Sequence, residues 1–255
     1  MCIVYPSGTS LVNYKIIINM TLYHYTSLEN LPLIVRKDGY LEFLLTDYMD
    51  FDDPSEGKKM WKVIRDVDKK WVEDIWERFV ISFCIENDNL AMLKEYANNA
   101  SGVVLAINSD YLDRGTLFQC RYDLSIVNHI KDRILRIKED FKDRDKETDW
   151  RANTQERAYI KREMAKLLAI KAPHYNYEQE WRLRMSGRME NVVFQFKRGR
   201  LRQRYPLIVD IKALEKIYVG PNNSPSVIDE IKMYLRYTTI PKMDVEMLKV
   251  PYRSR

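Results

Sequence analysis

The chain has 255 residues, of which 45% are hydrophobic and 31% charged, and its net charge is +5. This length and apolar content are enough to bury a full core, and we expect one large domain. No apolar run approaches the roughly 18 residues that a membrane-spanning helix needs, so we expect a soluble protein with no membrane partner.

The cysteines and the N-terminal stretch indicate a cytoplasmic location. Cys2, Cys84 and Cys120 are odd in number and widely spaced, with no Cys-x-x-Cys pair. This pattern argues against both a disulfide framework and a zinc site, and we predict no metal. The stretch before Met20 lacks a basic n-region and a small-residue cleavage site. We interpret residues 1–21 as an N-terminal extension, and Met20 as a candidate true start.

The first predicted strand contains Tyr23-His24-Tyr25-Thr26-Ser27. Side chains alternate along a strand, so Leu22 and His24 share one side and Tyr23 and Tyr25 the other. Thr26-Ser27 offers a cap for a helix of apolar residues that ends near Asp38-Gly39. His24 therefore lies at the end of a strand, where it can point into a cleft. The alternative is that it hydrogen-bonds a neighbouring carbonyl inside a packed sheet.

The middle of the chain alternates between strand and helix patterns. We predict strands over 40–45, 79–84 and 102–107, a turn over 47–57, a Trp-rich amphipathic helix over 60–75 and a short helix over 90–96. Residues 124–170 then read as charged helices, with one apolar stripe at Ile126, Ile130, Ile134 and Ile137.

The C-terminal part returns to strands at 181–185, 192–196, 217–220 and 244–250, with a helix over 225–237. Strands and helices lack a regular βαβ rhythm, which favours an α+β fold. We expect two small, mostly antiparallel sheets that form a cleft and are flanked by helices. The chain would form a single domain over 22–255 with a helical insertion at 124–170.

Basic residues are concentrated late in the chain. Between positions 182 and 204 only Glu190 opposes a series of cations: Arg182, Arg184, Arg188, Lys197, Arg198, Arg200, Arg202 and Arg204. Arg198, Arg200, Arg202 and Arg204 form a candidate phosphate patch for a nucleotide or a nucleic acid. The alternative is a solvated hairpin and loop, which we favoured because no aromatic interleaving or nucleic-acid motif accompanies the stripe.

Several blocks together resemble the bacterial domain-of-unknown-function family 2971, over most of the chain from Leu22 to Pro221. The blocks are residues 23–27, 51–56, 81–84, 87–92 with Tyr96, 102–104, 177–182 and 217–221. Leu93 stands where the family commonly has Trp, and Asp52 and Ser55 replace Asn and Phe in its Asn-Asp-Pro-Phe-Glu block. The family has no settled activity, so membership alone names no reaction.

A more distant resemblance suggests a reaction. The early His24, a central Tyr and a late Glu before a strand look like the His-Tyr-Glu layout of ADP-ribosyltransferases and RNA 2′-phosphotransferases. That likeness implies an enzyme that binds NAD and cleaves its nicotinamide N-glycosidic bond, with a role in bacterial or phage conflict. One departure is Tyr25, which replaces the Gly that usually follows the His.

The resemblance also implies roles for individual residues. Glu180 would stabilise the ribose cation of the transition state, and His24 would hold a ribose hydroxyl. Tyr96, or else Tyr25, would stack on nicotinamide. Arg182 would contact the pyrophosphate. Thr26 and Glu178 complete the NAD-binding set, and the choice between Glu178 and Glu180 as the acting carboxylate stays open.

Two other functions compete with this one. Asp52, Asp53 and Glu56, with Glu178 or Glu180, have the oxygen ligands of a Mg²⁺- or Mn²⁺-dependent nuclease. A non-catalytic module would recognise a nucleotide or nucleic acid through the basic stripe, as the sensor or inhibitor half of a conflict system. In that case His24 and Glu180 would belong to a structural polar network.

Overall fold

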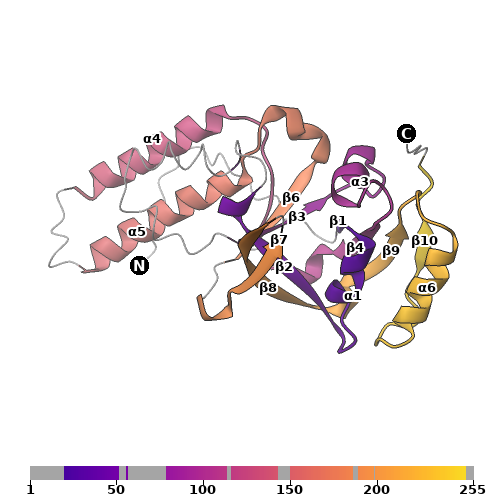
Figure 1. The fold of residues 1–255 in the computed structure, drawn as a ribbon. Helices are drawn as coiled ribbons and strands as arrows, with labels where there is room; N and C mark the ends of the chain where they lie inside the picture. Colours follow the sequence, from indigo (N-terminus) through magenta and orange to yellow (C-terminus); the bar gives the residue numbers. More distant parts are fainter. Residues whose placement is uncertain are drawn as a thin grey trace.

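The computed structural model describes residues 20–51, 56, 79–113, 116–142, 150–185, 189–197 and 199–250. These residues form one ten-stranded sheet, antiparallel except for the pair β9 and β10 (Figure 1). The strands are β1 (Thr21–Thr26), β2 (Tyr40–Asp47), β3 (Phe79–Cys84), β4 (Val103–Asn108), β5 (Leu117–Gln119), β6 (Glu180–Met185), β7 (Val193–Lys197), β8 (Arg200–Asp210), β9 (Leu214–Val219) and β10 (Val245–Met247).

A single mixed sheet replaces the two small sheets that the sequence predicted. The main strand order is β10-β9-β4-β1-β3-β2-β8-β7, and β6 pairs with both β3 and β5. Strand β3 is the reason: β1 contacts one of its ends at Cys84, and β2 contacts the other at Phe79 and Val80. Its opposite edge pairs with β6 along its whole length. Hydrogen bonding through β3 therefore makes the sheet continuous, and the α+β class is confirmed.

Five helices are described: α1 (Leu31–Ile34), α3 (Leu90–Tyr96), α4 (Ser125–Asp140), α5 (Trp150–Ala165) and α6 (Ser226–Leu235). α4 and α5 pack side by side and extend away from the sheet (Figure 1), and both lie within the segment predicted to be helical. Ile130 and Ile134 of the predicted stripe are buried between them and the sheet. The helix predicted over 60–75, residues 1–19 and Cys2 lie outside the described residues. The single-domain assignment stays a prediction.

The two faces of the sheet bury different cores. One face carries the main core, with Leu22, Phe43, Phe83, Leu105 and Leu183, under α1 and α6. The opposite face carries two smaller cores. One surrounds α3 and Cys84, and the other lies beneath α4 and α5. None of the described helices has the length and apolar character needed to cross a membrane. Cys84 and Cys120 are both free and buried.

A close backbone approach fixes the position of α3 against the sheet. Gly102 donates its N–H to the Ala97 carbonyl at 2.8 Å, and its own carbonyl accepts from Gly220 at 2.9 Å. A Cβ at position 102 would lie 2.2 Å from the Thr26 carbonyl oxygen. A side chain cannot fit there without moving backbone, because no flexible group is available to give way.

We therefore expect Gly102→Ala to lower the free energy of unfolding by on the order of 3 kcal/mol, through overpacking against backbone. The matched control is Gly199→Ala. A Cβ there meets no atom within 4 Å, but φ is +73°, so the cost should be about 1 kcal/mol. Urea unfolding followed by circular dichroism measures both variants. Equal losses would contradict this account of Gly102.

Candidate functional site

Five charged side chains meet on the face of the sheet that carries the two smaller cores. Glu180 and Arg182 lie two apart on β6 and so point to the same side. Glu178 ends the short turn η6 (Pro173–Glu178), and Lys171 precedes it. We name this group the Glu–Lys–Arg cluster; its members are Glu56, Lys171, Glu178, Glu180 and Arg182. All five are buried, with relative exposures of 2–5%.

Lys171 is the centre of the cluster. Its Nζ donates to Glu180 Oε2 at 2.9 Å and to Glu178, and it lies 3.1 Å from Glu56 Oε1. One ammonium thus contacts three carboxylates that come from three separate segments of the chain. Its pKa is raised because Glu180, Glu56 and Glu178 outweigh the effect of burial.

Arg182 uses all three of its nitrogens inside the protein. Nε donates to Glu180 Oε1 at 2.7 Å, Nη1 to the Leu168 carbonyl at 2.8 Å, and Nη2 to Glu56 at 2.5 Å and Glu180 at 3.0 Å. Its guanidinium lies 5.0 Å from the ring centre of Phe51. These bonds use four of its five N–H groups, and the side chain is buried. The geometry therefore gives Arg182 a role inside the cluster, and its predicted contact with a pyrophosphate stays a prediction.

The two glutamates of β6 and η6 differ in their electrostatics. Although burial alone would raise it, Arg182 and Lys171 lower the pKa of Glu180 to about 2. Burial, helped by Glu180 and Glu56, raises the pKa of Glu178 despite its bond to Lys171. Three carboxylates share two cations, which leaves a net charge of −1 when all are ionised. Glu178 is the member that most readily takes up the proton that neutralises the cluster.

Tyrosine rings lie beside this cluster. Tyr96, at the end of α3, is 46% exposed, yet burial and the neighbouring Glu178 raise its pKa. Tyr177 is 48% exposed, and the Tyr175 ring centre is 4.8 Å from Lys171 Nζ. Tyr96 is thus within electrostatic reach of Glu178 and Glu180, on a helix that packs against η6.

His24 is not part of this group. Tyr23 pairs with Cys84, and Cys84 pairs with Glu180, so these three side chains share a face. His24 follows Tyr23 and points to the opposite face, where its ring packs edge-on against Phe43 and Phe83. Its Nδ1 is 3.1 Å from the Ser82 carbonyl, and burial lowers its pKa. The expected cleft shared by His24 and Glu180 is therefore wrong, and the packed-sheet alternative describes His24.

The other two residues of the predicted NAD-binding set have internal partners. The Tyr25 hydroxyl donates to the Glu86 carbonyl at 2.6 Å and accepts from the Asn89 N–H at 3.3 Å. Tyr25 is buried next to Cys84 and α3. The Thr26 hydroxyl accepts from the Asn30 amide at 3.0 Å. Both side chains stabilise the β1 end and its neighbours, and we see no direct role for either in binding NAD.

The candidate phosphate patch is divided by the structure. Arg200 is exposed on β8, whereas Arg204 is buried, 3.7 Å from an Asp50 carboxylate oxygen, and Arg202 donates to the Asp50 carbonyl. Arg198 lies outside the described residues. Two of the four arginines therefore hold the base of the β7–β8 hairpin against the turn after β2.

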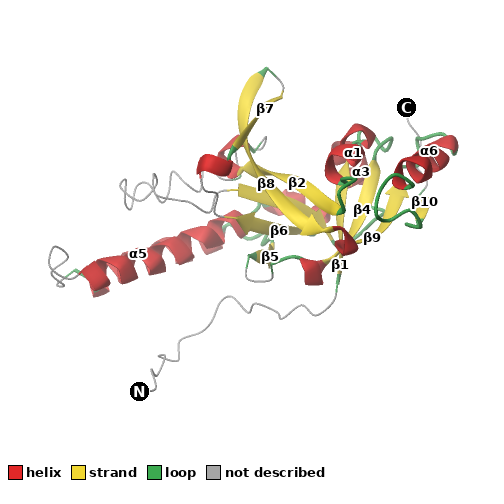
Figure 2. Cartoon of the chain, turned by 90° about the horizontal axis from the view of Figure 1, so that it is seen from below, coloured by secondary structure: helices red, strands yellow, loops and turns green. Residues whose placement is uncertain are grey.

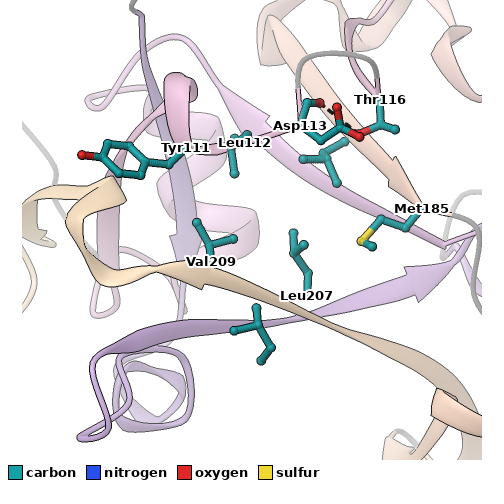
Figure 3. Close-up of a pocket in the computed structure, with 9 residues that line it drawn as sticks. Tyr111, Leu112, Asp113, Thr116, Met185, Leu207 and Val209 are labelled. Atoms are coloured by element: carbon teal, nitrogen blue, oxygen red, sulfur yellow. Dashed lines mark hydrogen bonds between the residues drawn. The ribbon is translucent and has the colours of Figure 1, made fainter.

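A pocket of about 310 Å³ opens elsewhere, on the main-core side, between β6, β8 and the residues after β4. Leu183, Met185, Leu207 and Val209 make its walls, and Asp113 and Thr116 lie on its rim (Figure 3). The Thr116 hydroxyl donates to the Asp113 carbonyl at 3.0 Å. None of the predicted site residues lines this pocket.

The metal hypothesis meets a competing cation. Asp52 and Asp53 lie outside the described residues, and Glu56, Glu178 and Glu180 all contact Lys171. Within the described ranges, no group of three or more Asp, Glu, His or Cys residues is placed to hold a metal ion. The ammonium occupies the position between the carboxylates that a divalent cation would need.

Residues 92–183 match the model of a family described as "Protein of unknown function (DUF2971)". This match supports the resemblance seen in the sequence for the segment that contains Tyr96, Lys171, Glu178, Glu180 and Arg182. The blocks at 23–27, 51–56, 81–84 and 217–221 lie outside the matched segment, and the block at 87–92 shares only its last residue with it. No curated protein and no solved structure gives a significant match to the chain.

Sequence reasoning missed Lys171 altogether. The sequence does contain a clue to it, because Lys171 is the single charged residue in the apolar run Leu167-Leu168-Ala169-Ile170-Lys171-Ala172. An isolated Lys in such an apolar run is expected to be buried with a carboxylate partner. Glu56 was considered as a metal ligand, but in the structure it pairs with Lys171 and Arg182.

The charge count makes a stability prediction. Lys171→Met would leave three buried carboxylates with one cation, and we expect it to lower the free energy of unfolding by about 3–5 kcal/mol. Glu178→Gln removes the surplus negative charge and should cost far less. Lys142→Met is the control, because Lys142 is an exposed residue paired with Glu139 at 3.3 Å. Urea titrations at neutral pH compare them. If Glu178→Gln lost more unfolding free energy than Lys171→Met, the balance of three carboxylates against two cations would be refuted.

The two glutamates also predict opposite dependences of stability on pH. Glu180 has a folded pKa of about 2 against an ordinary value of 4.5, so its contribution, on the order of 3 kcal/mol, is present above pH 4.5 and is lost as the pH falls towards 2. Glu178 has a raised pKa, so its favourable contribution is complete at low pH and is lost as the pH rises through the folded value. Urea unfolding from pH 7 down to pH 3 should show a shallower acid loss for Glu180→Gln than for the wild type. An unchanged acid slope in that variant would rule out this assignment.

Proposed function

We propose that the chain is an enzyme that cleaves the N-glycosidic bond of a nucleotide, with the Glu–Lys–Arg cluster as its reactive centre. The observation that carries the proposal is a buried cluster with surplus negative charge beside the half-exposed ring of Tyr96. Breaking a glycosidic bond develops positive charge on the ribose, and preorganised negative charge stabilises that charge in the transition state. The ring of Tyr96 offers an apolar surface on which the leaving base can stack.

The geometry favours Glu178 over Glu180 as the acting carboxylate. Glu180 accepts from Arg182 twice and from Lys171 once, and its pKa is about 2, so it stays ionised and anchored. Glu178 is bound by Lys171 and has a raised pKa. In hydrolysis the C1′–N bond breaks with its electron pair going to the base. Water then bonds to C1′ and gives a proton to Glu178. Nicotinamide leaves NAD as a neutral molecule, so Glu178 releases this proton to solvent, whereas a base that leaves as an anion would take it up.

NAD stays the first candidate substrate, but fewer of the residues named through the resemblance are available to bind it. In this proposal the nicotinamide stacks on the exposed ring of Tyr96, and its ribose lies towards Glu178. The ADP half would need cations other than Arg182, whose nitrogens are all engaged within the protein. His24 lies on the other face of the sheet and takes no part in this proposal. A role in conflict between bacteria and phage stays a prediction.

The competing functions have less support. A nuclease would need Lys171 to leave the space between the carboxylates. A module that binds phosphate through the basic stripe would depend on Arg200, because Arg202 and Arg204 are engaged with Asp50. Both alternatives remain outcomes of the experiment below.

The test is release of the free base from NAD and from other nucleotides, followed by chromatography. We expect Glu178→Gln to reduce turnover by 100-fold or more, as is typical for loss of a general acid–base group. Tyr96→Ala should weaken substrate binding, and Tyr96→Phe should retain it, since stacking needs the ring and not the hydroxyl.

Two control variants make the result specific. Glu95→Gln changes an exposed carboxylate next to Tyr96 and should leave turnover unchanged. His24→Gln should also retain turnover, whereas the His-Tyr-Glu layout of ADP-ribosyltransferases requires its loss. Unfolding curves for each variant separate loss of activity from loss of fold. Wild-type rates in a folded Glu178→Gln variant would overturn the proposal, and activity that depends on Mg²⁺ would favour the nuclease.

A further inference from the structure

The hairpin of β7 and β8 carries an exposed apolar patch. Phe194 is 59% exposed, Phe196 74% and Leu201 65%. Phe196 pairs with Leu201, and side chains alternate along a strand, so all three lie on one face of the hairpin. Figure 2 shows β7 projecting away from the rest of the sheet. Three large apolar side chains this exposed on one short hairpin mark an interaction surface.

The same strand is the open edge of the sheet. In the described part of the chain β7 pairs with β8 alone and ends the strand order. The other terminal strands, β5 and β10, have three residues each, and β10 carries the exposed charge of Glu246. Short or charged edges resist pairing with another chain. β7 has five residues with two Phe near its centre, and its one charge is at its last residue, Lys197, so its middle lacks this protection.

The hairpin register determines which backbone groups of β7 are unpaired. Lys197 pairs with Arg200, which leaves a two-residue loop that includes Gly199 with φ +73°. The pair that closes such a loop is hydrogen-bonded, and bonded and non-bonded pairs then alternate along the ladder. The N–H and C=O groups of Gln195 therefore face β8, and those of Phe194 and Phe196 face outward.

We propose that β7 pairs antiparallel with β7 of a second copy of this chain, about a two-fold axis at Gln195. Gln195 then lies opposite Gln195, Phe194 opposite Phe196, and Val193 opposite Lys197. The outward groups of Phe194 and Phe196 exchange hydrogen bonds, and two aromatic cross-strand pairs form. This contact is isologous, so it closes as a dimer.

Charge decides between this arrangement and its alternatives. The antiparallel register places each Lys197 opposite a Val, whereas parallel pairing would place Lys197 opposite Lys197, which is unfavourable. A single-stranded nucleic acid could also stack on the Phe rings. That partner is less favoured, because Arg202 and Arg204, on the opposite side of the hairpin from the Phe rings, are already engaged with Asp50.

Cysteine cross-linking tests the register directly. Directly opposite, non-hydrogen-bonded positions bring side chains closest, so Gln195→Cys should form a disulfide-linked dimer under mild oxidation. Val193→Cys and Lys197→Cys should each fail to cross-link alone but should cross-link when mixed. All these proteins carry Cys2→Ser, because Cys2 lies outside the described residues, and Cys2→Ser alone is the blank, since Cys84 and Cys120 are buried. Cross-linking of Val193→Cys with itself, or none with Gln195→Cys, would overturn the proposed register.

Sedimentation velocity of the full chain tests the assembly itself. We expect the wild type to be a dimer at micromolar concentration and Phe196→Lys to be a monomer with an unchanged circular dichroism spectrum. Met233→Lys, at a position 58% exposed on α6, is the matched control and should remain a dimer. A monomeric wild type would overturn the proposal. If that monomer bound oligothymidylate and Phe196→Lys lost the binding, the patch would belong to a nucleic acid instead.

Discussion

The balance of buried charge around Lys171 constrains the rest of this structure. Three carboxylates and a guanidinium can lose their water only because each finds a partner within hydrogen-bonding distance. Those partners come from β6, from η6 and from Glu56, so the cluster joins segments far apart in sequence. It also lies between the two smaller cores, which have no residue in common within the described ranges. The register of β3 with β6 must place Glu180 and Arg182 on this face for the cluster to form.

Much of the fold could be predicted from the sequence, because local patterns determine it. The strand 79–84 and the helix 90–96 were predicted with their observed bounds, the strand from its apolar run. In the structure the side chain of Asn89 caps this helix. The eleven-residue strand β8 was missed, because its arginines resemble a solvated loop. In the sheet, the first arginines lie at a two-stranded edge, and the later residues bury Tyr205 and Val209. The aromatic residues Phe194 and Phe196 also accompany the basic stripe, on the other face of the same hairpin.

The candidate site shows where such reasoning ends. The alternation of side chains correctly places Glu180 and Arg182 on one face of β6. It also places Leu22 and His24 on one face of β1. Each of these predictions concerns a single strand. Whether His24 and Glu180 share a face depends on how β1, β3 and β6 are paired, and no local pattern contains that register. The same limit explains why Lys171 was missed, because the chain must fold before the three glutamates that contact it come together around its ammonium. The resemblance to ADP-ribosyltransferases implied a site that joins Tyr96 to Glu178 or Glu180; α3 does pack against η6, and the roles of these residues stay predictions.

The cluster costs stability that an apolar core of the same volume would not. Replacing buried ion pairs by well-packed hydrophobic residues is often neutral or stabilising, so charge balance by itself does not explain the surplus carboxylate. If the cluster only joined two cores, two carboxylates for two cations would suffice. The third carboxylate, Glu178, lies next to the half-exposed Tyr96 and Tyr177, where it can act on a molecule that reaches those rings. Its raised pKa is the energetic consequence of being the extra anion, and a group in that state is suited to accept and release a proton. In the proposed function, the carboxylate that leaves the cluster unbalanced in charge is also the one that performs the chemistry.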